Sequence, residues 1–77
     1  MNRIKIEGSS NIAEIGYDHG IMTLEIKFHS GGIYKYWPIT QEGFEGLLKA
    51  PSKGKYFFEK IRGNPKINFQ KVEEIQS

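Results

Sequence analysis

Apolar and polar side chains alternate along residues 21–28, and this is the most regular pattern in the chain. Every second residue from Met22 to Phe28 is apolar, and the residues between them are Thr23, Glu25 and Lys27. A period of two is typical of a β-strand with one buried and one solvated face. The pattern therefore predicts a half-buried strand with its even-numbered side chains in the core.

Two further strands are predicted beside it. Residues 12–17 are rich in β-branched and aromatic side chains, and Asp18-His19-Gly20 follows as a turn in which Gly20 could adopt a positive φ. Residues 33–37 form the third strand, which Pro38 ends because proline has no N–H to donate. Together these segments predict a three-stranded antiparallel meander.

The two consecutive glycines of the second hairpin decide which face of the sheet Tyr34 and Tyr36 occupy. In a two-residue turn, Phe28 lies opposite Ile33 and both tyrosines lie on the polar face. In a three-residue turn with a bulge at the second glycine, Phe28 lies opposite Tyr34 and both tyrosines face the core. Both registers stay open, and we favour the second because the first would place Lys35 among core residues.

Two helices are predicted after the third strand. Thr40 suits an N-cap, and apolar residues follow it at helical spacing: Phe44, Leu47 and Leu48. Ser52 suits the N-cap of a second helix over residues 53–62, which Gly63-Asn64-Pro65 stops. We expect both helices to pack on one face of the sheet, which makes the fold class α+β.

The ends of the chain are less regular. Residues 1–8 could be an edge strand or a frayed arm, and residues 66–77 form a C-terminal tail. In the tail we expect a strand-like contact near Ile67 and Phe69 and fraying after Glu74. The prediction is one domain over residues 9–65, to which an extra terminal strand could be added.

Composition excludes several classes of protein. The 77 residues include no cysteine, so disulfides, thiolate metal sites and thiol nucleophiles are excluded. Small secreted domains more often carry disulfides, the N-terminus has no apolar run of a signal peptide, and no stretch is long enough to span a membrane. We therefore expect a cytoplasmic protein without membrane contact.

Catalytic and metal-binding signatures are weak. His19 and His29 both lie in predicted turns, where a lone histidine is usually a solvated side chain. The sequence has no H-x-x-x-H pair and no pair of carboxylates at a helical metal spacing near a histidine, and Gly8-Ser9-Ser10 lacks the context of a nucleophile elbow. We expect no enzyme activity, no metal and no cofactor.

Basic charge is concentrated in one segment. The net charge is only +2, but residues 49–66 hold six basic side chains against one acidic side chain, a local charge of +5. The candidate contacts for an anion or a nucleic acid in this segment are Ser52, Lys53, Lys55, Lys60 and Arg62. The alternative interpretation is a capped helix with a solvated basic face.

Aromatic and basic residues also meet in the third strand, at Lys35, Tyr36 and Trp37. Bases of single-stranded RNA or DNA stack on exposed aromatic rings, while lysines neutralise phosphates. The alternative is that these aromatics close the core and its rim. In the favoured register, Lys35 and Trp37 point away from the core and are the better candidates for contact.

A series of short motifs covers about residues 9–62: Ser10-Asn11-Ile12, Ile15-Gly16-Tyr17-Asp18, Leu24-Glu25-Ile26-Lys27-Phe28, Ser30-Gly31-Gly32-Ile33-Tyr34-Lys35-Tyr36, Pro38, Leu47-Leu48, Ala50, Ser52-Lys53-Gly54, Tyr56-Phe57 and Ile61-Arg62. Their order and spacing resemble the KTSC domain family, which is named after a C-terminal extension of some lysyl-tRNA synthetases and also occurs as small bacterial and phage proteins. Trp37 and the tail after Pro65 lie outside the pattern. The resemblance implies the α+β fold of a domain of unknown function, proposed to bind RNA, and implies no catalytic residue.

Two functions are therefore expected from the sequence. The first is a small RNA-binding or single-stranded nucleic-acid-binding module that uses the basic segment and nearby aromatics. The alternative is a protein-interaction module, such as a small bacterial or phage protein that docks on a host complex through an exposed patch of Ile33 and Trp37. The oligomeric state is left open.

Overall fold

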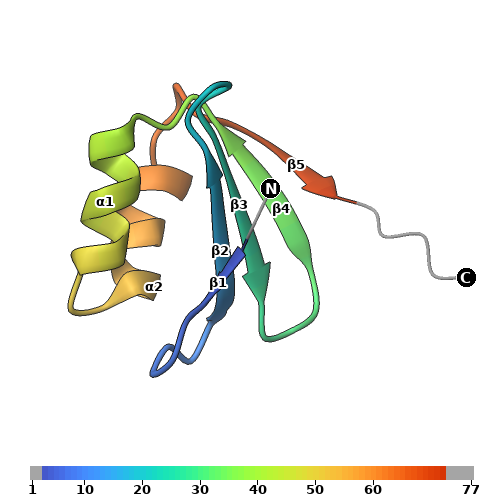
Figure 1. Cartoon of the computed structure of the whole chain (residues 1–77), viewed down its shortest axis with the longest axis vertical. Helices are drawn as coiled ribbons and strands as arrows, with labels where there is room; N and C mark the ends of the chain where they lie inside the picture. The colour runs from blue at the N-terminus through green and yellow to red at the C-terminus, as the bar shows by residue number, and fades with distance from the viewer. Residues whose placement is uncertain (1–2, 73–77) are drawn as a thin grey trace, which may run out of the picture.

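The computed structural model describes residues 3–72, which form a five-stranded antiparallel sheet with helices on one side (Figure 1). The strands neighbour one another in chain order and are β1 (Arg3–Lys5), β2 (Ile12–Asp18), β3 (Thr23–Phe28), β4 (Ile33–Trp37) and β5 (Asn68–Val72). The α+β class is confirmed. The predicted meander corresponds to β2, β3 and β4, and the sheet gains one short strand at each edge.

Both predicted helix caps are present. The hydroxyl of Thr40 accepts a hydrogen bond from the backbone N–H of Gly43 at 3.1 Å, and α1 (Gln41–Lys49) follows. The hydroxyl of Ser52 accepts from the backbone N–H of Lys55 at 3.3 Å at the start of α2 (Lys53–Tyr56). These hydroxyls satisfy backbone donors that lack partners in the first turn of a helix.

The second helix changes its geometry along its length. After α2 the chain continues without a break as η1 (Phe57–Arg62), which has the wider turn of a π-helix. The N–H of Gly63 donates to the carbonyl of Phe58 at 2.9 Å at its end. The predicted helix over residues 53–62 is thus correct in extent, but its second half is not α-helical.

The core lies between the sheet and the helices. It contains Leu24 and Ile26 of β3, as the alternation predicted, together with residues from both helices. Met22, which was also expected in the core, is 37% exposed, and Thr23, which was expected on the solvated face, is buried. Its buried members are Ile6, Ile12, Ile15, Leu24, Ile26, Tyr36, Ile39, Leu47, Phe57 and Ile61. At one end of this layer the ring of Tyr17 stacks on that of Phe44 at 4.5 Å, and the hydroxyl of Tyr17 donates to the carbonyl of Ile39 at 2.6 Å.

The hairpin between β3 and β4 differs from both expected registers. Ile26 lies opposite Tyr34 and Leu24 lies opposite Tyr36, so each tyrosine is two positions away from the partner that the three-residue turn predicted. The positive φ of 102° belongs to Gly31, the first glycine and not the second. Because a shift of two residues preserves the face of every side chain, both tyrosines still point toward the helices.

The turn between β2 and β3 also differs in detail. The residue with a positive φ is Met22, at 50°, whereas Gly20 was expected to take this conformation. The N–H of Gly20 instead donates to the carboxylate of Asp18 at 3.0 Å. This side-chain contact stabilises the turn where the prediction relied on the flexibility of glycine.

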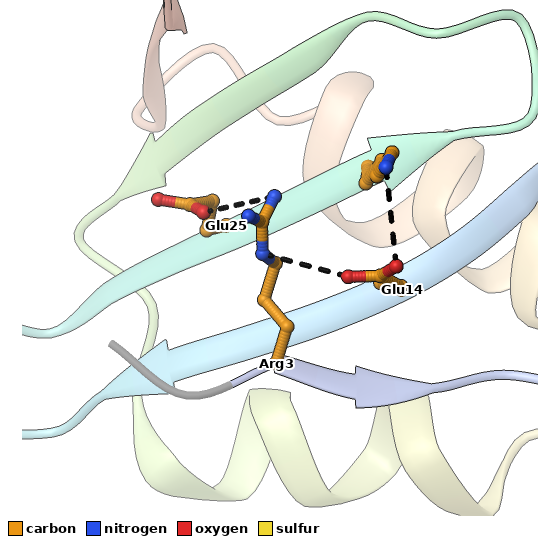
Figure 2. Close-up of polar contacts among 4 residues, drawn as sticks. Arg3, Glu14 and Glu25 are labelled. Atoms are coloured by element: carbon orange, nitrogen blue, oxygen red, sulfur yellow. Dashed lines mark ion pairs between the residues drawn. The ribbon is translucent and has the colours of Figure 1, made fainter. Parts of the chain in front are cut away.

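The open face of the sheet carries a network of charges. Figure 2 shows Arg3 on β1 reaching across β2 between Glu14 and Glu25. Its guanidinium lies 3.6 Å from the carboxylate of Glu14 and 3.4 Å from that of Glu25, and the ammonium of Lys27 lies 4.0 Å from Glu14. These side chains come from three neighbouring strands, and the register β1–β2–β3 brings them together.

The end of the tail is only partly described. The strand-like contact expected near Ile67 and Phe69 is present as β5, which pairs with β4. The fraying expected after Glu74 lies outside the described residues. Within residues 3–72, no helix has the length and hydropathy needed to cross a bilayer.

Candidate nucleic-acid interface

A polar hollow of about 240 Å³ lies between the start of α2 and the loop that joins β1 to β2. On the helix side it is lined by Ser52, Lys53 and Lys55, which are three of the predicted site residues. On the loop side it is lined by the segment from Glu7 to Asn11. The structure therefore brings the predicted anion contacts together with a loop that the sequence did not connect to them.

A second, more apolar hollow of about 300 Å³ lies beside the first. It is lined by the aromatic residues Phe28, Phe57 and Phe58 and by the tip of the β3–β4 hairpin at His29 and Ser30. The two hollows share part of their lining, namely Ser10, Asn11, Gly54 and Phe58. We call the two together the Phe58 groove.

Phe58 forms the exposed aromatic surface of this groove. Its side chain is 53% exposed, and its ring rests edge-to-face on the ring of Phe57 at 5.6 Å. Phe57 in turn is buried against Phe28 and Tyr36, at 5.5 and 5.1 Å. The buried rings support Phe58 from below and leave one face of a large aromatic side chain available to a ligand.

Local contacts hold the walls of the groove in place. The hydroxyl of Ser9 accepts from the backbone N–H of Ile12 at 3.0 Å, and a ring nitrogen of His29 is hydrogen-bonded to the carbonyl of Ser9 at 3.0 Å. A Cβ atom on Gly54 would lie 3.2 Å from the side-chain nitrogen of Asn11, so glycine allows the helix to approach the loop closely. His29, expected to be solvated, therefore joins the hairpin to the loop.

The basic side chains differ in how freely they could meet an anion. The ammonium of Lys53 contacts the carbonyl of Ala50 at 3.4 Å, which holds it near the end of α1. Lys55 and Arg62 are exposed, and neither forms an ion pair with another residue in the range 3–72. Lys55 lies three residues before Phe58, and both line the polar hollow.

Arg62 extends the positive charge toward β4. Burial raises the pKa of the Tyr36 hydroxyl to about 12, and the charge of Arg62 acts in the opposite direction. This opposing effect places Arg62 close to Tyr36. Tyr36 itself is only 3% exposed, so its predicted role as a direct contact is wrong: it supports the aromatic layer beneath the groove.

Lys60 lies at a different place on the molecule. It lines a separate hollow of about 220 Å³ with Lys66, beside Pro38 and Thr40. Tyr56, whose hydroxyl donates to the carbonyl of Gly43 at 3.2 Å, is also part of its lining. The basic segment is therefore divided between two hollows that share no lining residue.

Lys35 and Trp37 lie on the other face of the sheet. In the strand register, Lys35 lies opposite Glu25 of β3 and Gln70 of β5, and Trp37 lies opposite Asn68 of β5. Because they alternate with Tyr34 and Tyr36, Lys35 and Trp37 lie on the face away from the helices. They cannot contribute to one continuous surface with Ser52, Lys53 and Lys55. The exposed patch expected around Trp37 is also smaller than predicted, because Ile33 is only 3% exposed and Trp37 is partly buried.

Phe58 was not among the residues predicted to contact a ligand. It follows Phe57 in the second helix, and adjacent helical residues point about 100° apart. Only one of two neighbouring aromatics can then face the sheet, and the pair itself was the signal. Among the described residues, no group of three or more His, Asp or Glu side chains is placed to hold a metal ion.

With the groove defined, its surroundings can be compared with known proteins. Residues 8–64 match the KTSC domain, which covers both the loop and the helix that line the groove. The chain belongs to the KTSC domain family. A crystal structure of a KTSC domain protein from Yersinia pestis is similar, with a TM-score of 0.85 and 33% identity over 94% of this chain and 97% of that one.

Relatives of this KTSC domain occur alone and within a larger enzyme. An uncharacterized protein of Stutzerimonas stutzeri is 37% identical over 57 residues, which is 74% of this chain and 79% of that protein. A lysine–tRNA ligase of Nostoc punctiforme is 38% identical over 69 residues, which is 90% of this chain. This KTSC domain spans only 12% of the length of that ligase.

Proposed function

We propose that this KTSC domain binds single-stranded RNA through the Phe58 groove. One observation carries the proposal: an exposed phenylalanine stands between an apolar hollow and a polar hollow that is lined by Lys53 and Lys55. A base would stack on Phe58 on the apolar side, and the adjoining phosphate would lie on the lysine side. This combination of a stacking platform and a positive groove is how single strands are bound without a fixed sequence.

The shape of the groove favours an unpaired strand over a duplex. In a duplex the faces of the bases are stacked on one another, and only their edges and the backbone are accessible. Phe58 offers an aromatic face, which an unpaired base can cover. The carboxylate of Glu7 and the side chain of Asn11 line the polar hollow, where they could hydrogen-bond to a base edge.

The relatives agree with an RNA ligand. By its name, the ligase of Nostoc punctiforme acts on a tRNA, and this KTSC domain is similar to a small part of it. A separate module that contacts RNA would serve such an enzyme by holding its substrate. The same contact would serve a small KTSC protein that acts on its own.

Fluorescence anisotropy with a labelled single-stranded RNA of about ten nucleotides tests the proposal. We expect binding that weakens as salt is raised, since phosphate contacts release counterions. Phe58→Ala should weaken binding by about 5- to 100-fold, the effect of removing one stacked base. Lys55→Ala should weaken binding and lower the salt dependence by about one phosphate contact.

Lys35→Ala is the matched control, because Lys35 lies on the opposite face of the sheet. It removes the same charge as Lys55→Ala and should leave RNA binding unchanged. Absence of binding at low salt would refute the proposal. So would equal losses in Lys35→Ala and Lys55→Ala, or equal binding of single-stranded and duplex RNA.

A further inference from the structure

The two edges of the sheet differ in how well they are protected from pairing with another strand. β1 has only three residues, and Arg3 is engaged with Glu14 and Glu25 across the open face. Short strands that carry charge are the usual protection of a sheet edge. β5, at the other edge, has five residues, pairs with β4 without a register shift and contains neither proline nor glycine.

The side chains of β5 are exposed as well as its backbone. All of its residues are exposed except Val72, which is partly buried, and Phe69 is 66% exposed. Figure 1 shows β5 at the edge of the sheet that lies far from α1 and α2, so neither helix covers this strand. Among residues 3–72, β5 is the last strand of the sheet and pairs with no strand on its outer side, and it carries a large exposed apolar ring. This is the arrangement that accepts a further strand.

We propose that β5 pairs with β5 of a second copy of this chain in an antiparallel, two-fold symmetric arrangement. In the register that overlaps all five residues, the axis passes beside Gln70, and Phe69 of each copy lies opposite Lys71 of the other. A two-fold interface requires that such a pairing hold in both directions. β5 meets this requirement with one aromatic ring and one cation placed symmetrically about its central residue.

The faces of the side chains support this pairing. Phe69 lies opposite Tyr36 in the sheet and Lys71 lies opposite Tyr34, so both project on the helix-covered face. The ring of Phe69 already contacts that of Tyr36 at 6.3 Å. In the pair, the ammonium of Lys71 from the second copy would lie over the outer face of Phe69, where a cation is attracted to the ring. The result is a ten-stranded sheet without the two exposed β5 edges.

Cross-linking tests the register directly, because the chain has no cysteine of its own. A Gln70→Cys variant should form a disulfide-linked dimer in a glutathione redox buffer, since the two Gln70 positions face each other at the axis. Lys5→Cys is the matched control: Lys5 is exposed on the opposite edge strand. We expect the Lys5 variant to cross-link more slowly, by tenfold or more.

Sedimentation equilibrium of the unmodified protein, without RNA, tests association itself. We expect a reversible dimer between micromolar and millimolar concentrations. Gln70→Lys and Gln70→Glu should each weaken it by about 2- to 5-fold, because like charges then face each other, and an equimolar mixture of the two should recover it. A monomer at millimolar concentration, a dimer indifferent to both variants, or equal cross-linking rates at the two edges would overturn the proposal. These outcomes do not depend on RNA binding.

Discussion

The two faces of this sheet are built from the same strands, yet they depend on different physical interactions. On the helix-covered face, alternate residues of β2, β3 and β4 enter a core in which six large side chains are fully buried: Phe57, Ile12, Ile15, Leu24, Ile26 and Leu47. On the open face, Arg3, Glu14, Glu25 and Lys27 form ion pairs while keeping part of their surface in water. Removing apolar surface from water stabilises a fold far more than partly solvated ion pairs do.

The comparison also bears on the proposed RNA-binding site. The Phe58 groove opens at the rim of the helix-covered face, where the aromatic layer reaches the surface. On the open face, Arg3, Glu14, Glu25 and Lys27 already have partners within the sheet. A ligand that needs unpaired cations and an aromatic surface is therefore better served at the rim of the core than on the exposed sheet.

The largest test of this comparison is Leu47→Ala. Leu47 is fully buried between α1 and the sheet, and its truncation should lower the free energy of unfolding by about 2–5 kcal/mol. Urea denaturation followed by circular dichroism measures the change. Glu45→Ala, at an exposed position of the same helix, should change stability by no more than about 0.5 kcal/mol. Similar effects of the two substitutions would show that α1 is not held by its apolar face.

Much of the architecture behind that test was predictable. The alternation in residues 21–28 identified the core side chains of β3, and the hydroxyls of Thr40 and Ser52 marked the first residues of both helices. These features depend only on neighbours in the sequence. The π-helical turns of η1, and edge strands as short as β1, depend on packing against the rest of the molecule, which no local pattern records.

The hairpin shows where this kind of inference reaches its limit. The register that we favoured, because it keeps Lys35 out of the core, correctly placed Tyr34 and Tyr36 on the core face, but the cross-strand partners differ from it by two residues. The same limit applies to the site. Lys35 and Trp37 flank Tyr36 in sequence and were grouped with it, although neighbours along a strand point to opposite faces. The sequence grouped Lys53 and Lys55 of α2 as candidate contacts, whereas their proximity to the Ser9–Asn11 loop required the fold.

The second test uses pH. Burial raises the pKa of Tyr36 to about 12 in the folded protein, against about 10 in an unfolded chain. The folded state therefore retains its proton where the unfolded state loses it, so this contribution is complete below pH 10 and is lost as pH rises toward 12. The loss should reach roughly 3 kcal/mol.

Tyr36→Phe supplies the control for the pH test, since it keeps the ring and removes the ionising group. Urea denaturation at a series of alkaline pH values should show a shallower decline in this variant than in the unmodified protein. Some decline should remain, because burial also raises the pKa of Tyr17, and the neighbouring charge of Asp18 raises it further. Identical declines in the two proteins would mean that alkaline unfolding begins elsewhere, for example in the ion pairs of the open face.

The smallest expected effect is that of breaking the ion pairs on the open face. Arg3→Gln removes the cation that lies between Glu14 and Glu25 (Figure 2). We expect a loss of about 1 kcal/mol or less at low salt, because partly exposed pairs lose much of their attraction to solvent screening. The loss should shrink further at high salt.

Lys5→Gln, on the same strand and exposed, is the matched control and should change stability by less than about 0.5 kcal/mol. A loss for Arg3→Gln as large as that for Leu47→Ala, and insensitive to salt, would reverse the comparison and show that the open face holds the sheet together as strongly as the core does.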